Sequence, residues 1–298
     1  MAMKQTGQHP SMVLTTKKPQ QSCNNAPSPS GNFLLGHFIG LRKDPLRFLL
    51  DCASYGDIVR LRVGPRTIHF INDPYYIQHV LQTNSRNYRK GFALRRAKSI
   101  LGNGLLTSEG DFWLEQRRLI QPVFHRNRIA AMSNVMTERT QQQMDAWREL
   151  AKNNEVVDIA QEMMQLTLNI IGETMFSTDV SGDAKAVGDA LTTVVHFNNQ
   201  RLRQPFRILA ARRQKRRFKK ALKILDKIVY GLIEDRRDTA EDHHDLLTML
   251  LTARDEESGE GMRARQVRDE AMTLFLAGHA TTAHALTWTW YRLSSPPQ

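Results

Sequence analysis

The 298-residue sequence contains only two cysteines, Cys23 and Cys52. Two cysteines are too few for a disulfide framework, and they do not form the Cys-x-x-Cys spacing that is typical of metal sites. A chain that does not rely on disulfides suits a reducing compartment, so we predict a cytoplasmic protein.

Acidic residues are scarce as well. There are 30 acidic against 42 basic residues, which gives a net charge of +12, and no acid precedes Asp44. This charge favours acidic partners, namely nucleic acid, anionic lipid or an acidic protein. The most basic segment, Arg201 to Lys223, fits a solvated helix face, a membrane or acidic-partner surface, or a nucleic-acid site. Phe206 and Phe218 are too few aromatic residues for base stacking, so no nucleic-acid partner is expected.

The first thirty residues lack apolar runs. They are rich in Gln, Ser, Thr, Asn, Pro and Lys, and no run is long enough for a signal peptide or a transmembrane anchor. We predict that residues 1–30 form a disordered tail and that residues 31–298 form the folded domain.

The folded part carries the pattern of a mainly α protein with a small β-hairpin sheet. Residues 57–63 and 67–71 alternate between apolar and polar positions around Gly64-Pro65, which predicts the hairpin. Asn72-Asp73-Pro74 is a helix-start signal. Helical patterns occupy most of the remaining chain: residues 45–54, 75–82, 127–153, 159–176, 183–203 and 245–252.

The longest helix is predicted from Ala264 to Leu293, roughly 45 Å, and it carries no charge between Ala271 and Tyr291. Its threonines and histidines make it too polar for a membrane anchor, so we expect it to be buried in the protein. At ~100° per residue, four positions share one stripe: Ala277, Gly278, Thr281 and Ala285. Such a stripe suits a flat, rigid ligand, but a close helix crossing favours the same small residues. Both interpretations remain open.

A second pattern is Trp113-x-x-x-Arg117, which follows the loop Gly102-Asn-Gly. Residues four apart share one helix face, and a guanidinium beside an indole can bind both oxygens of a carboxylate. A surface cation–π pair or an ordinary ion pair gives the same spacing.

The two patterns together resemble the cytochrome P-450 haem-thiolate monooxygenases. Ala277-Gly278-His-Ala-Thr281-Thr282 is similar to the family's central helix, although Ala280 stands where the family usually has an acid. The run from Gly104 to His125 is similar to the family helix whose tryptophan and arginine bind a haem propionate.

The resemblance implies a soluble, bacterial-type monomer that oxidises a small organic substrate with dioxygen and two electrons. The cofactor would be haem b with its iron, and the electrons would come from a ferredoxin or flavodoxin-type donor with its reductase. Its site residues would be a propionate clamp, Trp113 and Arg117; room over the porphyrin at Ala277 and Gly278; and two catalytic hydroxyls, Thr281 and Thr282.

Two family motifs are missing from this sequence, Glu-x-x-Arg and the late Phe-x-x-Gly-x-x-x-Cys-x-Gly loop that supplies the iron's thiolate. Neither Cys23 nor Cys52 has the flanking residues, so no metal ligand is assigned in this chain. We expect an incomplete cytochrome P-450 fold, from a truncated gene product or a partial sequence, without activity of its own. The alternative is a non-catalytic basic helical protein that binds nucleic acid or an anionic membrane surface.

Overall fold

The computed structural model describes residues 26–177, 188–194, 197, 211–238, 245–255 and 259–294. The chain divides into two compact units, Met1–Arg89 and Lys90–Gln298. Most of the predicted tail, residues 1–25, lies outside the described residues. Residues 26–30 have no helix or strand, and Pro27 O accepts a hydrogen bond from Arg60 N–H at 2.8 Å.

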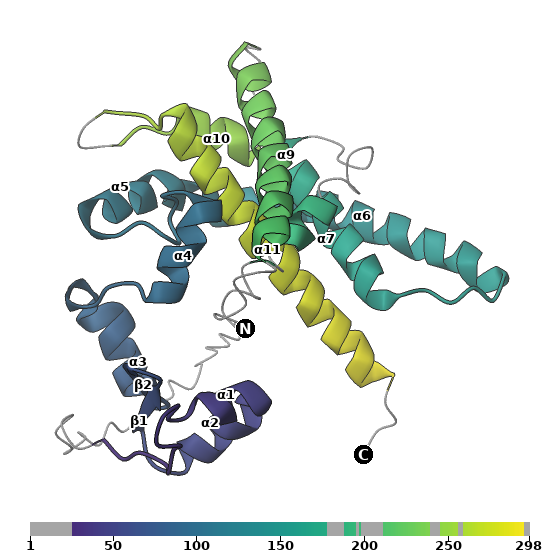
Figure 1. Ribbon diagram of the computed structural model, residues 1–298. Helices are drawn as coiled ribbons and strands as arrows, with labels where there is room; N and C mark the ends of the chain where they lie inside the picture. The colour runs from purple at the N-terminus through teal and green to yellow at the C-terminus, as the bar shows by residue number, and fades with distance from the viewer. Residues whose placement is uncertain are drawn as a thin grey trace, which may run out of the picture. The chain divides into compact units, whose positions relative to one another are not determined.

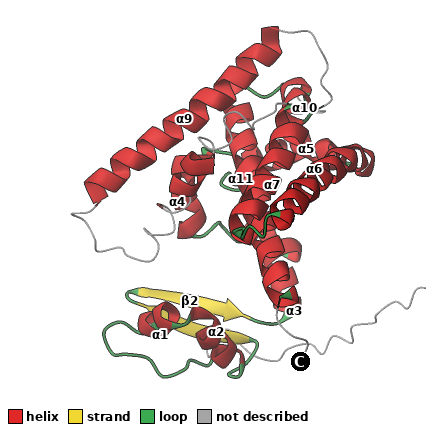
Figure 2. Ribbon diagram, turned by 90° about the vertical axis from the view of Figure 1, so that its right-hand side faces the viewer, coloured by secondary structure: helices red, strands yellow, loops and turns green. Residues whose placement is uncertain are grey.

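The first unit is built around the predicted hairpin. Strands β1 (Ile58–Val63) and β2 (Arg66–Ile71) form an antiparallel pair (Figure 2). In their register Ile58 lies opposite Ile71. Val59 and Leu61 are buried against Cys52, as the alternation predicts. The remaining elements are short: α1 (Phe38–Lys43), α2 (Pro45–Ala53), α3 (Pro74–Gln78), a π-helical turn (His79–Thr83) and a 3-10 turn (Ser85–Asn87).

The second unit is helical in its described part, which confirms the predicted mainly α class. Its α-helices are α4 (Phe92–Leu101), α5 (Gly110–Ile120), α6 (Arg126–Lys152), α7 (Ile159–Phe176), α9 (Ala211–Asp238), α10 (Leu246–Thr252) and α11 (Ala264–Leu293). A 3-10 turn (Gln121–Phe124) connects α5 to α6. Of the helix expected at 183–203, residues 188–194 and 197 are helical, and the others lie outside the described residues.

Helix α11 organises the second unit. It packs most extensively along α7, and α4, α9 and α10 also contact it (Figure 1). Its predicted bounds are confirmed, but the prediction that it is buried throughout is wrong. The neighbouring helices cover its first half, whereas Trp288 is 63% exposed and Leu293 is 70% exposed.

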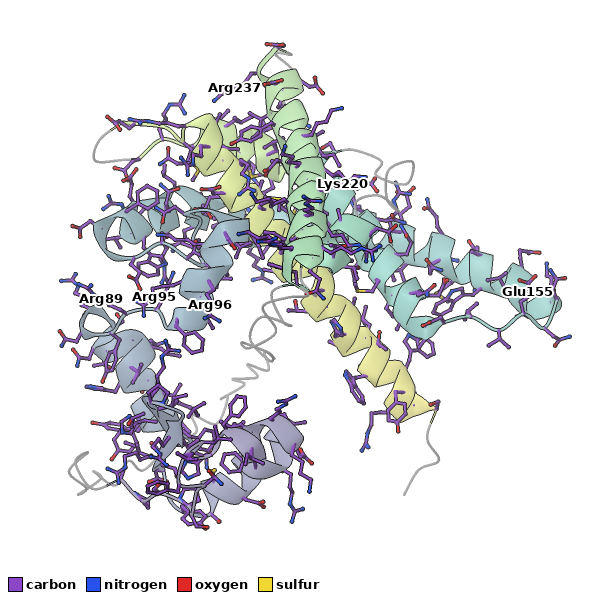
Figure 3. All side chains as sticks on the ribbon, viewed as in Figure 1. Arg89, Arg95, Arg96, Glu155, Lys220 and Arg237 are labelled. Atoms are coloured by element: carbon purple, nitrogen blue, oxygen red, sulfur yellow. The ribbon has the colours of Figure 1, made fainter. Side chains whose placement is uncertain are left out.

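The basic segment continues into α9. This helix buries Phe218, Ala221 and Leu225 in the core and exposes most of its basic side chains, among them Lys220 (Figure 3). The described part of the segment is therefore the solvated face of an amphipathic helix. Residues 201–210 lie outside the described residues. No helix in the described ranges combines the length and apolar character needed to cross a membrane.

Candidate functional site

The stripe of small residues on α11 divides between two environments. Ala277, Thr281 and Ala285 are exposed, and the Thr281 hydroxyl donates a hydrogen bond to Ala277 O. Gly278 is half-buried on the side of α7, where an added Cβ would lie 2.6 Å from Ile171 Cδ1. The exposed part of the stripe is free to receive a ligand, whereas Gly278 also has a packing reason to be small.

The polar side chains on either side of Thr281 also include both exposed and buried groups. Thr282 and His284 are exposed, but His279 is buried, with Nδ1 3.2 Å from Thr167 Oγ1 on α7. Burial and, to a smaller extent, the nearby His284 together lower the pKa of His279 to about 4. His279 is therefore neutral at physiological pH and belongs to the contact between α7 and α11. Within the described residues, no three His, Cys, Asp or Glu side chains gather as a metal site.

On α5, the structure brings Trp113 and Arg117 together. The Arg117 guanidinium carbon lies 5.2 Å from the centre of the Trp113 ring, and Lys90 Nζ lies 5.9 Å from the same ring. Arg117 is exposed, and Trp113 and Lys90 are half-buried. Two cations against one indole make a positively charged surface that can receive an anionic group.

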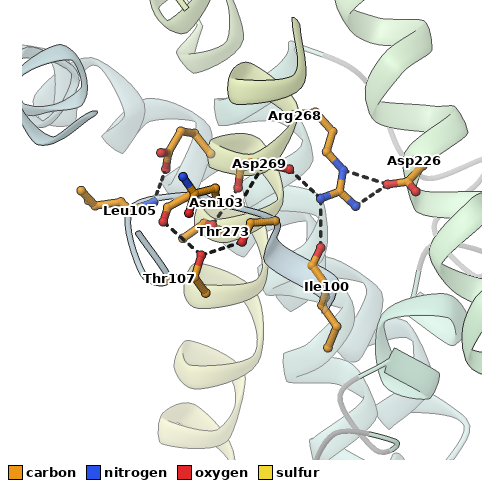
Figure 4. Close-up of polar contacts among 11 residues, drawn as sticks. Ile100, Asn103, Leu105, Thr107, Asp226, Arg268, Asp269 and Thr273 are labelled. Carbon is orange, nitrogen blue, oxygen red and sulfur yellow. Dashed lines mark hydrogen bonds and ion pairs between the residues drawn. The ribbon is translucent and has the colours of Figure 1, made fainter. Parts of the chain in front are cut away.

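The loop before α5 is anchored to the start of α11 (Figure 4). Asn103 N–H donates to Asp269 Oδ2 and Leu105 N–H donates to Glu270 Oε2, each at 2.8 Å. The close approach requires glycine, because a Cβ on Gly104 would lie 2.4 Å from Thr273 Oγ1 and 2.7 Å from Asp269 O.

Arg268 extends this anchor to other helices. Its guanidinium is buried and donates to Asp226 on α9 at 2.8 Å, to Ile100 O at the end of α4 at 3.0 Å, and to Asp269 at 2.9 Å (Figure 4). Because two of the three partners of this buried cation, Asp226 and Asp269, are carboxylates, its charge is compensated. The network fixes α4, α9 and the loop before α5 to one turn of α11.

Sequence reasoning did not identify three parts of this arrangement: Lys90, the loop anchor formed by Asp269 and Glu270, and the His279–Thr167 contact. One signal for the anchor was present, since two acids precede an uncharged helix and a Gly-x-Gly loop offers free backbone N–H groups. No local signal pairs His279 with Thr167, which lie 112 residues apart.

Comparison with known proteins connects these features. A model of the cytochrome P-450 family matches residues 26–298. The chain is 37% identical to cyclooctatin synthase of Streptomyces melanosporofaciens over 91% of its length and 59% of the relative's. It is 32% identical to cyclooctat-9-en-7-ol 5-monooxygenase of the same organism, over 94% of this chain and 61% of the relative. It is 31% identical to pentalenene oxygenase of Streptomyces avermitilis, over 91% of this chain and 60% of the relative. The chain thus spans about three fifths of the length of these curated relatives.

Proposed function

The chain belongs to the cytochrome P-450 family, and on this premise we propose that it takes part in the haem-dependent oxidation of an organic substrate by dioxygen and two electrons. Family membership favours this function over the alternative of a non-catalytic basic protein. The observation that carries the proposal is the exposed stripe of Ala277, Thr281 and Ala285 on a helix whose first half is buried.

The described residues fit one face of a haem and its propionates. A porphyrin needs a surface without bulky side chains, and Ala277 and Ala285 provide one. Its propionates need cations, and Arg117 is exposed beside the Trp113 ring. The iron's thiolate has no counterpart among the described residues, because Cys52 is 1% exposed in the first unit and burial raises its pKa. Cys23 lies outside the described residues.

Each site residue then has a distinct role. Arg117 and the Trp113 N–H would bind a propionate, and Ala277 and Gly278 would let the cofactor approach the helix backbone. Haem b, when bound, would supply the iron at which dioxygen is reduced. The Thr281 hydroxyl would hold and pass on a proton at Oγ1, because it can rotate away from Ala277 O. Thr282 would offer a second hydroxyl, and with Ala280 in place of an acid the transfer would rely on hydroxyls and water.

The names of the relatives support a proposal about the substrate, and family membership supports one about the electron donor. The names of two relatives refer to pentalenene and cyclooctat-9-en-7-ol, and we propose a small organic substrate for this chain too. A ferredoxin or flavodoxin-type protein with its reductase would deliver the electrons.

Arg117→Ala tests the clamp. The variant removes a charge-assisted contact worth about 1–3 kcal/mol, so haem should dissociate roughly ten- to a hundredfold faster. The measurement is haem transfer from the protein to an excess of a haem-scavenging globin, followed by absorbance.

Arg148→Ala is the matched control for this test. Arg148 is an exposed arginine on α6 that forms a surface ion pair with Asp145. Its removal lowers the net charge by the same amount and should leave the dissociation rate unchanged. Equal dissociation rates for the native protein and Arg117→Ala would refute the clamp.

A further inference from the structure

Glu270 is the one member of the loop anchor whose hydrogen bonds are incomplete. Its side chain is 1% exposed, and Oε2 accepts the Leu105 N–H, but Oε1 has no hydrogen-bond partner among the described residues. The pKa of this carboxyl is raised to about 7, mainly by burial and also by Asp269, against the opposing effects of the Leu105 N–H and Lys90. Glu270 therefore changes charge near neutral pH.

Lys90 connects this carboxyl to the indole of Trp113. Its Nζ donates to Leu105 O at 2.7 Å, and the same Leu105 bonds to Glu270 through its N–H. Lys90 N–H donates to Glu109 Oε1 at 2.6 Å, which holds the lysine at the start of α5. Burial lowers the pKa of Lys90, and the attraction of Glu109 and Glu270 counteracts that effect.

The charged groups around Glu270 differ in how firmly they are held. Asp269, the neighbour on α11, accepts from both Arg268 and Asn103, and Arg268 is itself held by Asp226 on α9. Lys90, in the segment before α4, interacts electrostatically with Glu270, and within the described part of the chain its ammonium makes one hydrogen bond, to the neutral Leu105 carbonyl. Among these groups, Lys90 is the one whose position depends most on the charge of Glu270.

We propose that Glu270 is a positioning residue for Trp113, and that its charge sets how firmly the Lys90 ammonium is held against the indole. An ionised Glu270 makes a charge-assisted bond to Leu105 N–H and attracts the Lys90 ammonium. A neutral Glu270 keeps a weaker bond and no longer attracts the lysine. The inference deepens the proposed function, since Trp113 belongs to its clamp.

The first test is the pH dependence of tryptophan emission between pH 5.5 and 8.5. Subtracting the spectra of Trp113→Phe isolates Trp113 from the other three tryptophans. The native protein should show a transition in the Trp113 signal with a midpoint near 7. Glu270→Gln, which keeps the shape of the side chain but cannot ionise, should abolish the transition. A transition that survives in Glu270→Gln, or a Trp113 signal that does not change with pH in the native protein, overturns the proposal.

The second test needs no variant, so it remains decisive if Glu270→Gln fails to fold. Hydrogen exchange of the Leu105 amide, corrected for its intrinsic pH dependence, should be roughly five- to tenfold better protected above the transition than below it. The Asn103 amide is the matched control, because its acceptor Asp269 stays paired with Arg268. Equal protection of Leu105 on both sides of pH 7 overturns the proposal. Neither test involves haem, so the outcomes of both tests are independent of the Arg117→Ala result.

Discussion

Single residues show most directly why this loop can lie so close to a helix. Gly102 has a positive φ of +58°, which an L side chain adopts only at a cost. A Cβ there would also lie 2.0 Å from Asp269 Oδ1. Asp269 cannot easily move, because Arg268 and Asn103 hold its carboxylate. Two independent reasons thus favour glycine at position 102: the positive φ of its backbone and the lack of space for a Cβ.

Gly102→Ala is expected to lower the free energy of unfolding by about 3 kcal/mol or more. About 1 kcal/mol comes from the positive φ, and the rest from the displaced carboxylate and its buried hydrogen bonds. The measurement is urea unfolding followed by tryptophan fluorescence.

Gly110→Ala separates these two contributions. Gly110 has nearly the same φ, +64°, but nothing lies within 4 Å of an added Cβ. This control should lose only the roughly 1 kcal/mol of the backbone conformation. If both variants lose the same free energy of unfolding, the close approach of Gly102 to Asp269 does not contribute to stability.

Among the helices, the contact between α7 and α11 includes small and neutral polar groups as well as large apolar side chains. Gly278 lets Ile171 approach the α11 backbone, and the His279 imidazole bonds to the Thr167 hydroxyl, which also donates to Met163 O at 2.9 Å. A charged imidazole in this position would be buried, and none of its contacts among the described residues is a carboxylate. The contact therefore depends on His279 being neutral.

The stability of this helix pair is expected to fall in acid. The pKa of His279 is lowered from 6.5 to about 4 in the folded protein, so between these values only the unfolded chain is protonated there. The stabilising contribution is complete above pH 6.5 and is lost as pH falls to 4, by about 3 kcal/mol. Urea unfolding of the native protein and His279→Gln over this range measures it, because the glutamine does not titrate.

His284→Gln is the control for this prediction. His284 lies on the same helix but is exposed, so its replacement should preserve the native pH dependence. If His279→Gln and the native protein lose stability in parallel between pH 6.5 and 4, the buried imidazole is not responsible.

For the molecule as a whole, the two units differ in how much core they contain. In the described part of the first unit the buried apolar side chains are Cys52, Val59 and Leu61, whereas the second unit buries one large cluster drawn from several helices. Stabilisation by burial grows with the apolar area removed from water. The first unit should therefore open under milder conditions than the second.

Two probes distinguish the units in urea. All four tryptophans lie in the second unit, at positions 113, 147, 288 and 290, whereas the Cys52 thiol is buried in the first. In a Cys23→Ser background, Cys52 should become reactive toward a thiol reagent at lower urea than the tryptophan emission changes. Coincident transitions would contradict the prediction and indicate a single cooperative unit.

Several features of this protein follow from local sequence because their physical causes act over a few residues. Alternation and a Gly-Pro turn place the hairpin, and the long uncharged run from Ala271 to Tyr291 predicts most of α11. The i, i+4 spacing alone puts Trp113 beside Arg117. The family patterns in the same stretches carry the cytochrome P-450 resemblance, which the family match over residues 26–298 confirms.

Other features depend on which helices pack together, and no local pattern encodes that. Residues that face a neighbouring helix and residues that face solvent have the same spacing along α11. Only the packing of α7 decides that Gly278 meets Ile171 while Ala277 and Thr281 stay exposed. The bonds from Asn103 and Leu105 to α11 join residues 166 and 165 positions apart. Burial by the surrounding helices, rather than residue type, raises the pKa of Glu270 and lowers that of His279.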